Sequence, residues 1–191
     1  VNHHGIQLEQ YWDLPFGKKR TKHSLQALRK VLISAIHARI PREVPTGIGL
    51  SGGLDSSIVA VVAKRFRATK KLLGACIRYQ GDENEDYRHA KILGKKQHIA
   101  LKSPELTEKQ LARLIDDCVV AMDGPFDTIR RMGMLANYAT LKKYGYKVAL
   151  IGEGADEFNL GYYHAFPGLK IDAKQCDTPG KLKKLFKKRA R

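Results

Sequence analysis

The apolar positions of the chain form two kinds of pattern, short continuous runs and stretches with three- and four-residue spacing. The short runs predict buried strands at 48–50, 72–79, 98–101 and 147–151. The helical spacing predicts helices at 23–40, 54–66, 86–97, 106–122 and 129–144, with Ser24 and Thr107 as caps of the first and the fourth. Strands that alternate with helices indicate an α/β protein with a parallel sheet and right-handed crossovers. A ligand is therefore expected at the carboxyl ends of the strands.

The segment between the first strand and the next helix reads SGGLDSS, residues 51–57. Gly52 and Gly53 let the backbone turn tightly and let a ligand approach it closely. The N–H groups of the loop and of the first helical turn, with the serine hydroxyls, suit a phosphate or pyrophosphate. A Gly-Gly turn with a serine cap is the ordinary alternative, but the complete string after a strand favours a phosphate loop. A Walker loop is excluded, because no Gly-Lys-Ser/Thr follows.

A cluster of carboxylates follows the fourth strand, at Glu153, Asp156 and Glu157. Acidic residues at the start of a helix often only cap it, and this accounts for one or two of the three. Opposite a phosphate loop they suit Mg²⁺, a hard cation that binds carboxylate and phosphate oxygens. Because both segments follow strand ends, we expect one crevice to hold them.

These segments resemble those of a known family. SGGLDSS resembles the pyrophosphate loop of the N-type ATP pyrophosphatases, and within that group the chain resembles the synthetase domain of class B glutamine-dependent asparagine synthetases and β-lactam synthetases. Three further segments match in the family's order, namely YWDLP at 11–15, DENEDY at 82–87 and GEGADE at 152–157. The resemblance covers about residues 11–166 and implies a Rossmann-like fold of the adenine nucleotide alpha hydrolase (HUP) type, with helices on both faces of the sheet.

The resemblance also implies ATP and Mg²⁺ as cofactors. It assigns Asp55 and Asp156 to the metal, and Glu153 to a catalytic place beside the acyl-adenylate and the incoming ammonia. The positions that match nucleotide-binding residues are Leu50, Ser51, Gly52, Gly53, Asp55, Ser56, Ser57, Ile77 and Gly152. Leu50 and Ile77 match positions near the adenosine, although Ile77 also reads as an ordinary residue of a buried strand.

The implied activity is an ATP-dependent amide ligation. A substrate carboxylate, aspartate by resemblance, attacks the α-phosphorus, pyrophosphate leaves, and ammonia from a glutaminase domain or subunit then expels AMP. A degenerate nucleotide-binding or RNA-binding module that makes no amide is the alternative. Intact Asp55, Glu153 and Asp156 favour the enzyme.

The sequence departs from the family in several places. Ile151 stands where serine is common, FNLGY at 158–162 replaces a segment with Gly-Gly, and residues 122–131 match no aspartate pocket, so the acceptor stays open. The family's helical segment after the second signature, with its catalytic lysine, has no match here. We therefore expect weak or no ammonia-dependent turnover from these 191 residues alone, whether they are a fragment or a stand-alone relative.

Composition agrees with one α/β domain. The chain has 191 residues, 43% of them hydrophobic, which suffices for a substantial core. No apolar run approaches the roughly 20 residues of a membrane span, and the first residues show no signal-peptide pattern. Three cysteines without CxxC spacing favour a reducing, cytoplasmic setting.

The net charge of +16 is concentrated near the end of the sequence, where nine basic and two acidic residues lie between 168 and 191. We expect a linker at 1–22, an ATP-pyrophosphatase domain at 23–166 and a basic, helical tail at 167–191. A basic surface suits an anionic substrate or a nucleic acid, and we expect ATP rather than nucleic acid. For the amphipathic part, KLKKLFKKRAR at 181–191, three readings stay open: the start of a packed helical region, an RNA-binding tail, or a membrane-surface patch.

Overall fold

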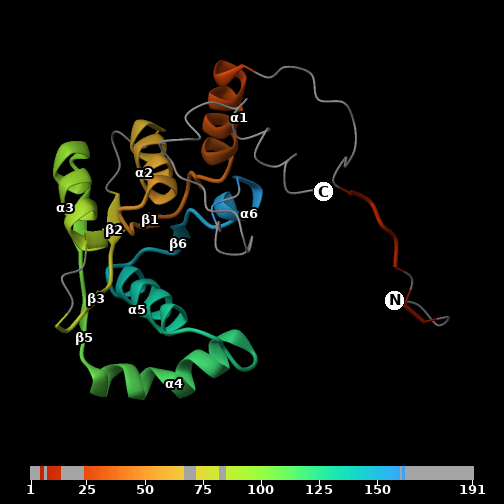
Figure 1. Ribbon diagram of the computed structural model, residues 1–191. Coiled ribbons are helices and arrows are strands. Elements are labelled where there is room, and N and C mark those ends of the chain that lie inside the picture. The colour runs from red at the N-terminus through yellow and green to blue at the C-terminus, as the bar shows by residue number, and fades with distance from the viewer. Residues whose placement is uncertain are drawn as a thin grey trace, which may run out of the picture.

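A computed structural model of the chain describes residues 5–6, 8–13, 24–66, 72–81, 85–159 and 161. Its centre is a parallel sheet of four strands in the order β4-β2-β1-β6 (Figure 1). The strands are β1 (Thr46–Gly49), β2 (Leu73–Ala75), β4 (Ala100–Lys102) and β6 (Val148–Leu150). Ile48 of β1 pairs with Gly74 on one side and with Leu150 on the other. The predicted parallel sheet is confirmed, and β1 is one of its two inner strands.

The described helices are α1 (Leu25–Ala38), α2 (Leu54–Phe66), α3 (Glu85–Gln97), α4 (Glu108–Met122), α5 (Ile129–Lys143) and the short α6 (Ala155–Asn159). Each long helix lies within two residues of its predicted bounds. Within the described part of the chain, no helix combines the length and the apolar character that a membrane span requires.

The sheet is covered on both faces. On one face, Ile48, Leu50 and Leu150 form a core with residues of α2 and α3. On the other face, Leu73 and Ala75 pack against Leu141 of α5. Figure 1 shows α1 and α2 on one side of the strands and α5 on the opposite side, with α4 beyond it. Strands buried on both faces explain why the sequence shows continuous apolar runs rather than alternation.

Helix α1 begins at the predicted cap, since the Ser24 hydroxyl accepts a hydrogen bond from the N–H of Ala27 at 3.1 Å. It packs along α2, where the ring of His37 stacks on Phe66 with centroids 3.9 Å apart. None of its residues is buried, and the side chain of Leu25 is 86% exposed. The apolar stripe of α1 is thus covered only in part by α2.

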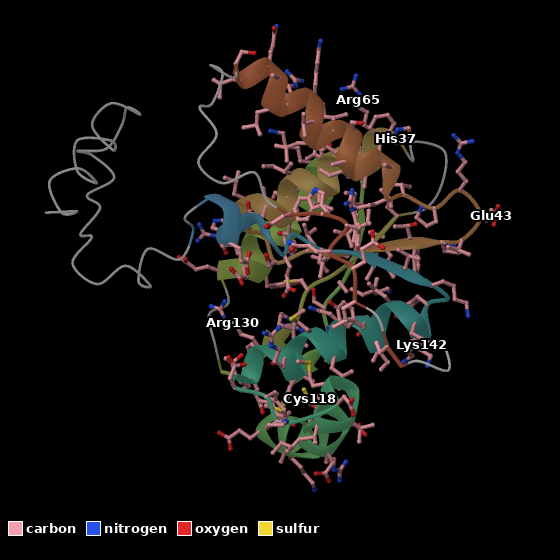
Figure 2. All side chains as sticks on the ribbon, turned by 90° about the vertical axis from the view of Figure 1, so that its right-hand side faces the viewer. His37, Glu43, Arg65, Cys118, Arg130 and Lys142 are labelled. Carbon is pink, nitrogen blue, oxygen red and sulfur yellow. The ribbon has the colours of Figure 1, made fainter. Side chains whose placement is uncertain are left out.

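Helix α4 also begins as predicted, at a capping box in which Thr107 and Gln110 exchange hydrogen bonds at 2.9 and 3.2 Å. The helical spacing of Leu111, Leu114, Ile115 and Cys118 predicts that all four face inward, but only Cys118 is buried, and Ile115 is exposed. Figure 2 shows Cys118 between α4 and α5. Fewer residues are buried than the spacing predicts because α4 packs mainly on α5 and not on the four-stranded sheet. A single neighbouring helix covers only a narrow stripe of apolar side chains on α4.

The predicted second strand is divided into β2 and β3 (Arg78–Tyr79), and β3 pairs with β5 (Glu105–Leu106), which the apolar pattern did not predict. The backbone hydrogen bonds nearly continue across the gap, from Cys76 N–H to Lys102 O at 3.0 Å and from Arg78 N–H to Pro104 O at 2.9 Å. Pro104 has no N–H to donate, so the ladder is interrupted at this point.

Two expectations about the ends of the chain have different outcomes. The aromatic residues of the linker predict a clamp that holds it to the domain, but the side chains of Tyr11 and Trp12 are 96% and 67% exposed, so this prediction is wrong. Leu14, Phe16 and the tail at 167–191 lie outside the described residues.

Candidate active site

A pocket of about 490 Å³ lies at the carboxyl ends of β1, β2 and β6, where the topology predicts a ligand. It brings together both of the predicted segments. The residues proposed from the sequence that line it are Ser51, Gly53, Asp55, Ser56, Ile77, Gly152, Glu153 and Asp156.

The loop between β1 and α2 is held in shape by its own hydrogen bonds. The Ser56 hydroxyl donates to Gly53 O at 3.2 Å, and the Ser51 and Ser56 oxygens lie 2.9 Å apart. Since a hydroxyl has one proton, Ser51 donates to Ser56 while its oxygen accepts from the N–H of Gly53 at 3.3 Å. The first N–H groups of α2 have no partner within the helix and stay available to an anion.

Gly52 is the position at which this loop packs against the start of α3. Its φ of +79° is a left-handed conformation that favours glycine. A Cβ at this position would collide with the backbone oxygen of Asp86 and lie 2.7 Å from the Cβ of His89. The first turns of α3 therefore support the loop from behind, and Asp86 is the residue of the DENEDY segment that contacts it.

Gly152 is the position at which the GEGADE segment packs against the SGGLDSS loop and the start of α2. A Cβ here would lie 2.9 Å from the Cβ of Asp55 and 2.9 Å from the N atom of Ser56. The end of β6 can approach the first turn of α2 this closely only without a side chain. The two segments are thus in direct contact, although about 100 residues separate them.

The carboxylates of Glu153, Asp156 and Glu157 line the pocket with Asp55 and Asp86. Among the described residues no three His, Cys, Asp or Glu side chains come together as a metal site. Mg²⁺ commonly takes only one or two protein carboxylates, with phosphate oxygens and water completing its shell. Asp55 and Asp156 in one pocket therefore fit a magnesium ion that arrives with a nucleotide.

Three residues assigned from the sequence do not line this pocket. Leu50 is fully buried in the core, and its N–H donates to Ala75 O of the neighbouring strand at 2.9 Å. Ser57 faces the groove between α1 and α2 instead. Asp55 and Ser56 line the pocket, and Ser57, a further 100° around α2, lies on the side that faces α1. Gly52 acts from behind the loop and does not line the pocket.

Helix α5 supplies side chains that sequence reasoning did not assign. Arg130, Asn137 and Tyr138 line the pocket, and Arg131 Nη1 lies 3.9 Å from Glu153 Oε1. The sequence did contain a sign that the arginines belong to a site. Two adjacent basic residues at the N-terminus of a helix interact unfavourably with the helix dipole, so their presence there calls for a reason other than helix stability. Burial raises the pKa of Tyr138, with Glu153 raising it further and Arg131 lowering it, which places all three close together.

Cys76 lies in the pocket wall at the end of β2. Burial, and next the charge of Asp86, raise the pKa of its thiol to about 11, while Arg78 lowers it. A thiol is a poor nucleophile while it is protonated. Cys76 is therefore a wall residue without acid–base chemistry at neutral pH.

The comparison with protein families matches residues 27–190 to the asparagine synthase family. This range begins in α1 and includes both segments that line the pocket. It covers well over half of the 191 residues.

Similar proteins agree with this match. The amidase chyE of Penicillium rubens is 33% identical over 80% of this chain and 25% of its own length. An asparagine synthetase (glutamine-hydrolyzing) of Lotus japonicus is 32% identical over 84% of this chain and 29% of its own. The chain thus spans between a quarter and a third of these relatives.

Among solved structures, the U34-tRNA thiolase NcsA of Methanococcus maripaludis has a TM-score of 0.51 and 15% identity, covering 74% of this chain and 51% of its own. At this identity the likeness concerns the fold alone. The predicted fold, a parallel sheet with helices of the PP-loop HUP type, is confirmed.

Proposed function

The chain belongs to the asparagine synthase family, and we propose that it uses ATP to activate a carboxylate and to join it to ammonia as an amide. The observation that carries this proposal is the single pocket lined by the SGGLDSS loop on one side and by Glu153 and Asp156 on the other. The loop suits the pyrophosphate part of ATP, and the carboxylates suit the metal and the amine.

The first step transfers the adenylyl group. A carboxylate oxygen of the acceptor attacks the α-phosphorus, the bond from that phosphorus to the bridging oxygen breaks, and pyrophosphate leaves with the electron pair. The N–H groups at the start of α2 would bind the pyrophosphate as its charge grows, and the hydroxyls of Ser51 and Ser56 would donate to it by turning from their present acceptors. Their mutual hydrogen bonds set their positions before ATP arrives.

The second step forms the amide. Ammonia attacks the acyl carbon, the bond from carbon to the phosphate oxygen breaks, and AMP leaves. Glu153 would accept the proton that nitrogen loses. Its carboxylate is held toward α5 by Arg131, which also lies 3.8 Å from Asp127 Oδ1. Both ion pairs are partly exposed, so they add little stability to the fold. Their effect is on position: Asp127 holds Arg131, and Arg131 orients Glu153.

Mg²⁺ bound to ATP would neutralise phosphate charge, with Asp55 and Asp156 as its protein ligands. We propose aspartate as the acceptor by analogy with the synthetases named above, and a glutaminase domain or subunit as the source of ammonia. Cys76 and Cys118 are free and buried, which agrees with the cytoplasm as the compartment.

The test begins with calorimetric titration of ATP and Mg²⁺ into the wild-type chain and into Asp55→Ala. Asp116→Ala, an identical change on the exposed surface of α4, is the control. We expect Asp55→Ala to lose magnesium-dependent binding, whereas Asp116→Ala binds as the wild type does. Equal affinity in all three proteins would refute the assignment of Asp55.

ATP–pyrophosphate exchange with a panel of carboxylic acids, aspartate included, then tests the reaction. The acid that supports exchange identifies the acceptor. Glu153→Gln should keep this exchange and abolish whatever weak ammonia-dependent amide formation the 191 residues show, because Glu153 acts only after adenylation. Loss of exchange in Glu153→Gln would contradict that role.

A further inference from the structure

A basic face lies on the side of the sheet opposite the pocket, at the amino ends of the strands. The helices α1, α2, α3 and α5 each lead to the start of a strand of this parallel sheet, so their C-termini gather on that side. In the described parts of these connections between helix and strand, Glu43 is the one acidic residue. The basic face consists of Arg39, Arg42, Lys64, Arg65, Lys95, Lys96, Lys142, Lys143 and Lys147.

The connections form one continuous surface. Three contacts join neighbouring connections: Lys64 Nζ donates to His98 O at 3.3 Å, the ring of His37 stacks on Phe66 with centroids 3.9 Å apart, and Lys147 N–H donates to Pro45 O at 3.2 Å. Figure 2 shows His37, Glu43 and Lys142 on the side of the molecule away from Arg130, which lines the pocket. The positive charges therefore add over a single face.

The helix dipole explains only part of this charge. It favours cations within the last turn of a helix, but Arg42 and Lys147 lie outside the helices. The lysines that are exposed and form no ion pair with any described residue are Lys95, Lys96, Lys142, Lys143 and Lys147. The described part of the protein leaves their positive potential uncompensated, which suits a polyanion.

Exposed aromatic rings lie among these cations. Tyr144 directly follows Lys143 and is 48% exposed, and Lys102 Nζ lies 4.8 Å from the centroid of its ring. Phe66 directly follows Arg65 and is 40% exposed. Cations interleaved with aromatic rings suit a single-stranded nucleic acid, whose phosphates pair with the cations and whose bases stack on the rings. An anionic membrane is bound instead by the apolar face of one amphipathic helix, whereas these charges come from several connections.

We propose that the basic face binds a single-stranded nucleic acid, with its lysines on phosphates and the ring of Tyr144 on a base. ATP is the anion expected from the sequence, and its pocket lies at the other ends of the strands. The basic face is thus a second anion site, and it does not depend on the proposed function. Composition does not reveal this site, because only the fold brings the connections together.

The test measures the fluorescence anisotropy of a labelled oligouridylate of about 16 nucleotides with the full chain, between about 50 and 200 mM salt. The face variant carries Lys95→Gln, Lys96→Gln, Lys142→Gln and Lys143→Gln. Its control, the tail variant, carries Lys183→Gln, Lys184→Gln, Lys187→Gln and Lys188→Gln. Both variants have the same net charge, so a difference between them reports the place of the charge and not its total.

We expect the face variant to bind at least tenfold more weakly at about 50 mM salt. The slope of log K against log salt should become shallower by about 3, since each lost phosphate contact contributes about 0.7. The tail variant should bind as the wild type does. Tyr144→Leu should weaken binding about fivefold or more at an unchanged slope, because a stacked ring carries no charge.

ATP calorimetry and thermal unfolding of the face variant should match the wild type, because its four lysines are exposed and do not line the pocket. The proposal is overturned if the wild-type chain does not bind the oligonucleotide at about 50 mM salt, or if the tail variant loses as much affinity as the face variant. Unchanged affinity in Tyr144→Leu overturns the contact with a base. Tighter binding to phosphatidylserine vesicles than to the oligonucleotide, at equal phosphate concentration, also overturns the proposal and identifies a membrane surface instead.

Discussion

Replacing Gly52 by alanine is expected to damage the site through two separable effects. The first is the left-handed backbone, with φ of +79°, which costs about 1–2 kcal/mol for a residue with a side chain. The second is the collision of the new Cβ with the first turn of α3, where Ala90 N lies 2.8 Å away and the oxygen of Asp86 is nearer still. Backbone atoms cannot rotate out of the way, so α3 must shift, at an added cost of about 1–3 kcal/mol.

Gly81→Ala is the matched control for this variant. Gly81 has a similar φ of +81°, but a Cβ there meets nothing within 4 Å. The control should therefore lose only the backbone part, about 1–2 kcal/mol, whereas Gly52→Ala should lose about 2–5 kcal/mol in total.

Urea unfolding gives both free energies, and ATP calorimetry shows whether the loop has moved. We expect Gly52→Ala to bind ATP at least tenfold more weakly, because a shift of about 1 Å in a positioned group already has large effects. Gly81→Ala should bind as the wild type does. If both variants lose the same stability and the same affinity, the contact between α3 and the loop does not support the site.

Three further predictions concern single residues. Gly152→Ala should weaken ATP binding, because a Cβ would push β6 away from Asp55, and calorimetry against a control such as Gly124→Ala, where a Cβ has open space, measures this. Cys76 should react with iodoacetamide at pH 8 about a hundredfold more slowly than an ordinary thiol, given the thiolate fraction at a pKa of about 11. An alkylation rate equal to that of free cysteine at pH 8 would contradict the burial of this thiol. The thiol of the unfolded chain ionises at a lower pH than the buried thiol, so the free energy of unfolding should fall as the pH rises from 9 to 11. Thr107→Ala should lower the free energy of unfolding by about 0.5–2 kcal/mol through loss of the cap of α4, and an unchanged urea midpoint would exclude that role.

The sequence predicted those features that depend on neighbouring residues. Ser24 and Thr107 were identified as caps because capping joins residues two or three positions apart. The bounds of α2, Leu54–Phe66, follow from the glycine loop before it and the basic turn after it. The meeting of the SGGLDSS loop with Gly152 followed from the general geometry of parallel sheets.

Features that depend on long-range packing escaped prediction. The orientation of Ser56 and Ser57 follows from the rotation of α2 against the sheet, which apolar spacing does not specify within one residue. The side chain of Leu50 turns into the core, whereas Gly49 and Ser51 on either side of it line the pocket. Asn137 lies in an ordinary helical pattern, and only the placement of α5 beside Ile77 shows that it lines the pocket.

The pairing of β1 with both β2 and β6 has a consequence for synthesis on the ribosome. The hydrogen bonds from Ile48 to β2 can form early, but its partner Leu150 is translated about 100 residues later. At about 5–20 residues per second, the open edge of β1 waits for roughly 5–20 s. During that time the nascent chain presents an unpaired, apolar strand edge, which is a template for wrong pairing. Slow elongation between β1 and β6 should therefore lower the yield of folded protein more than slow elongation after β6.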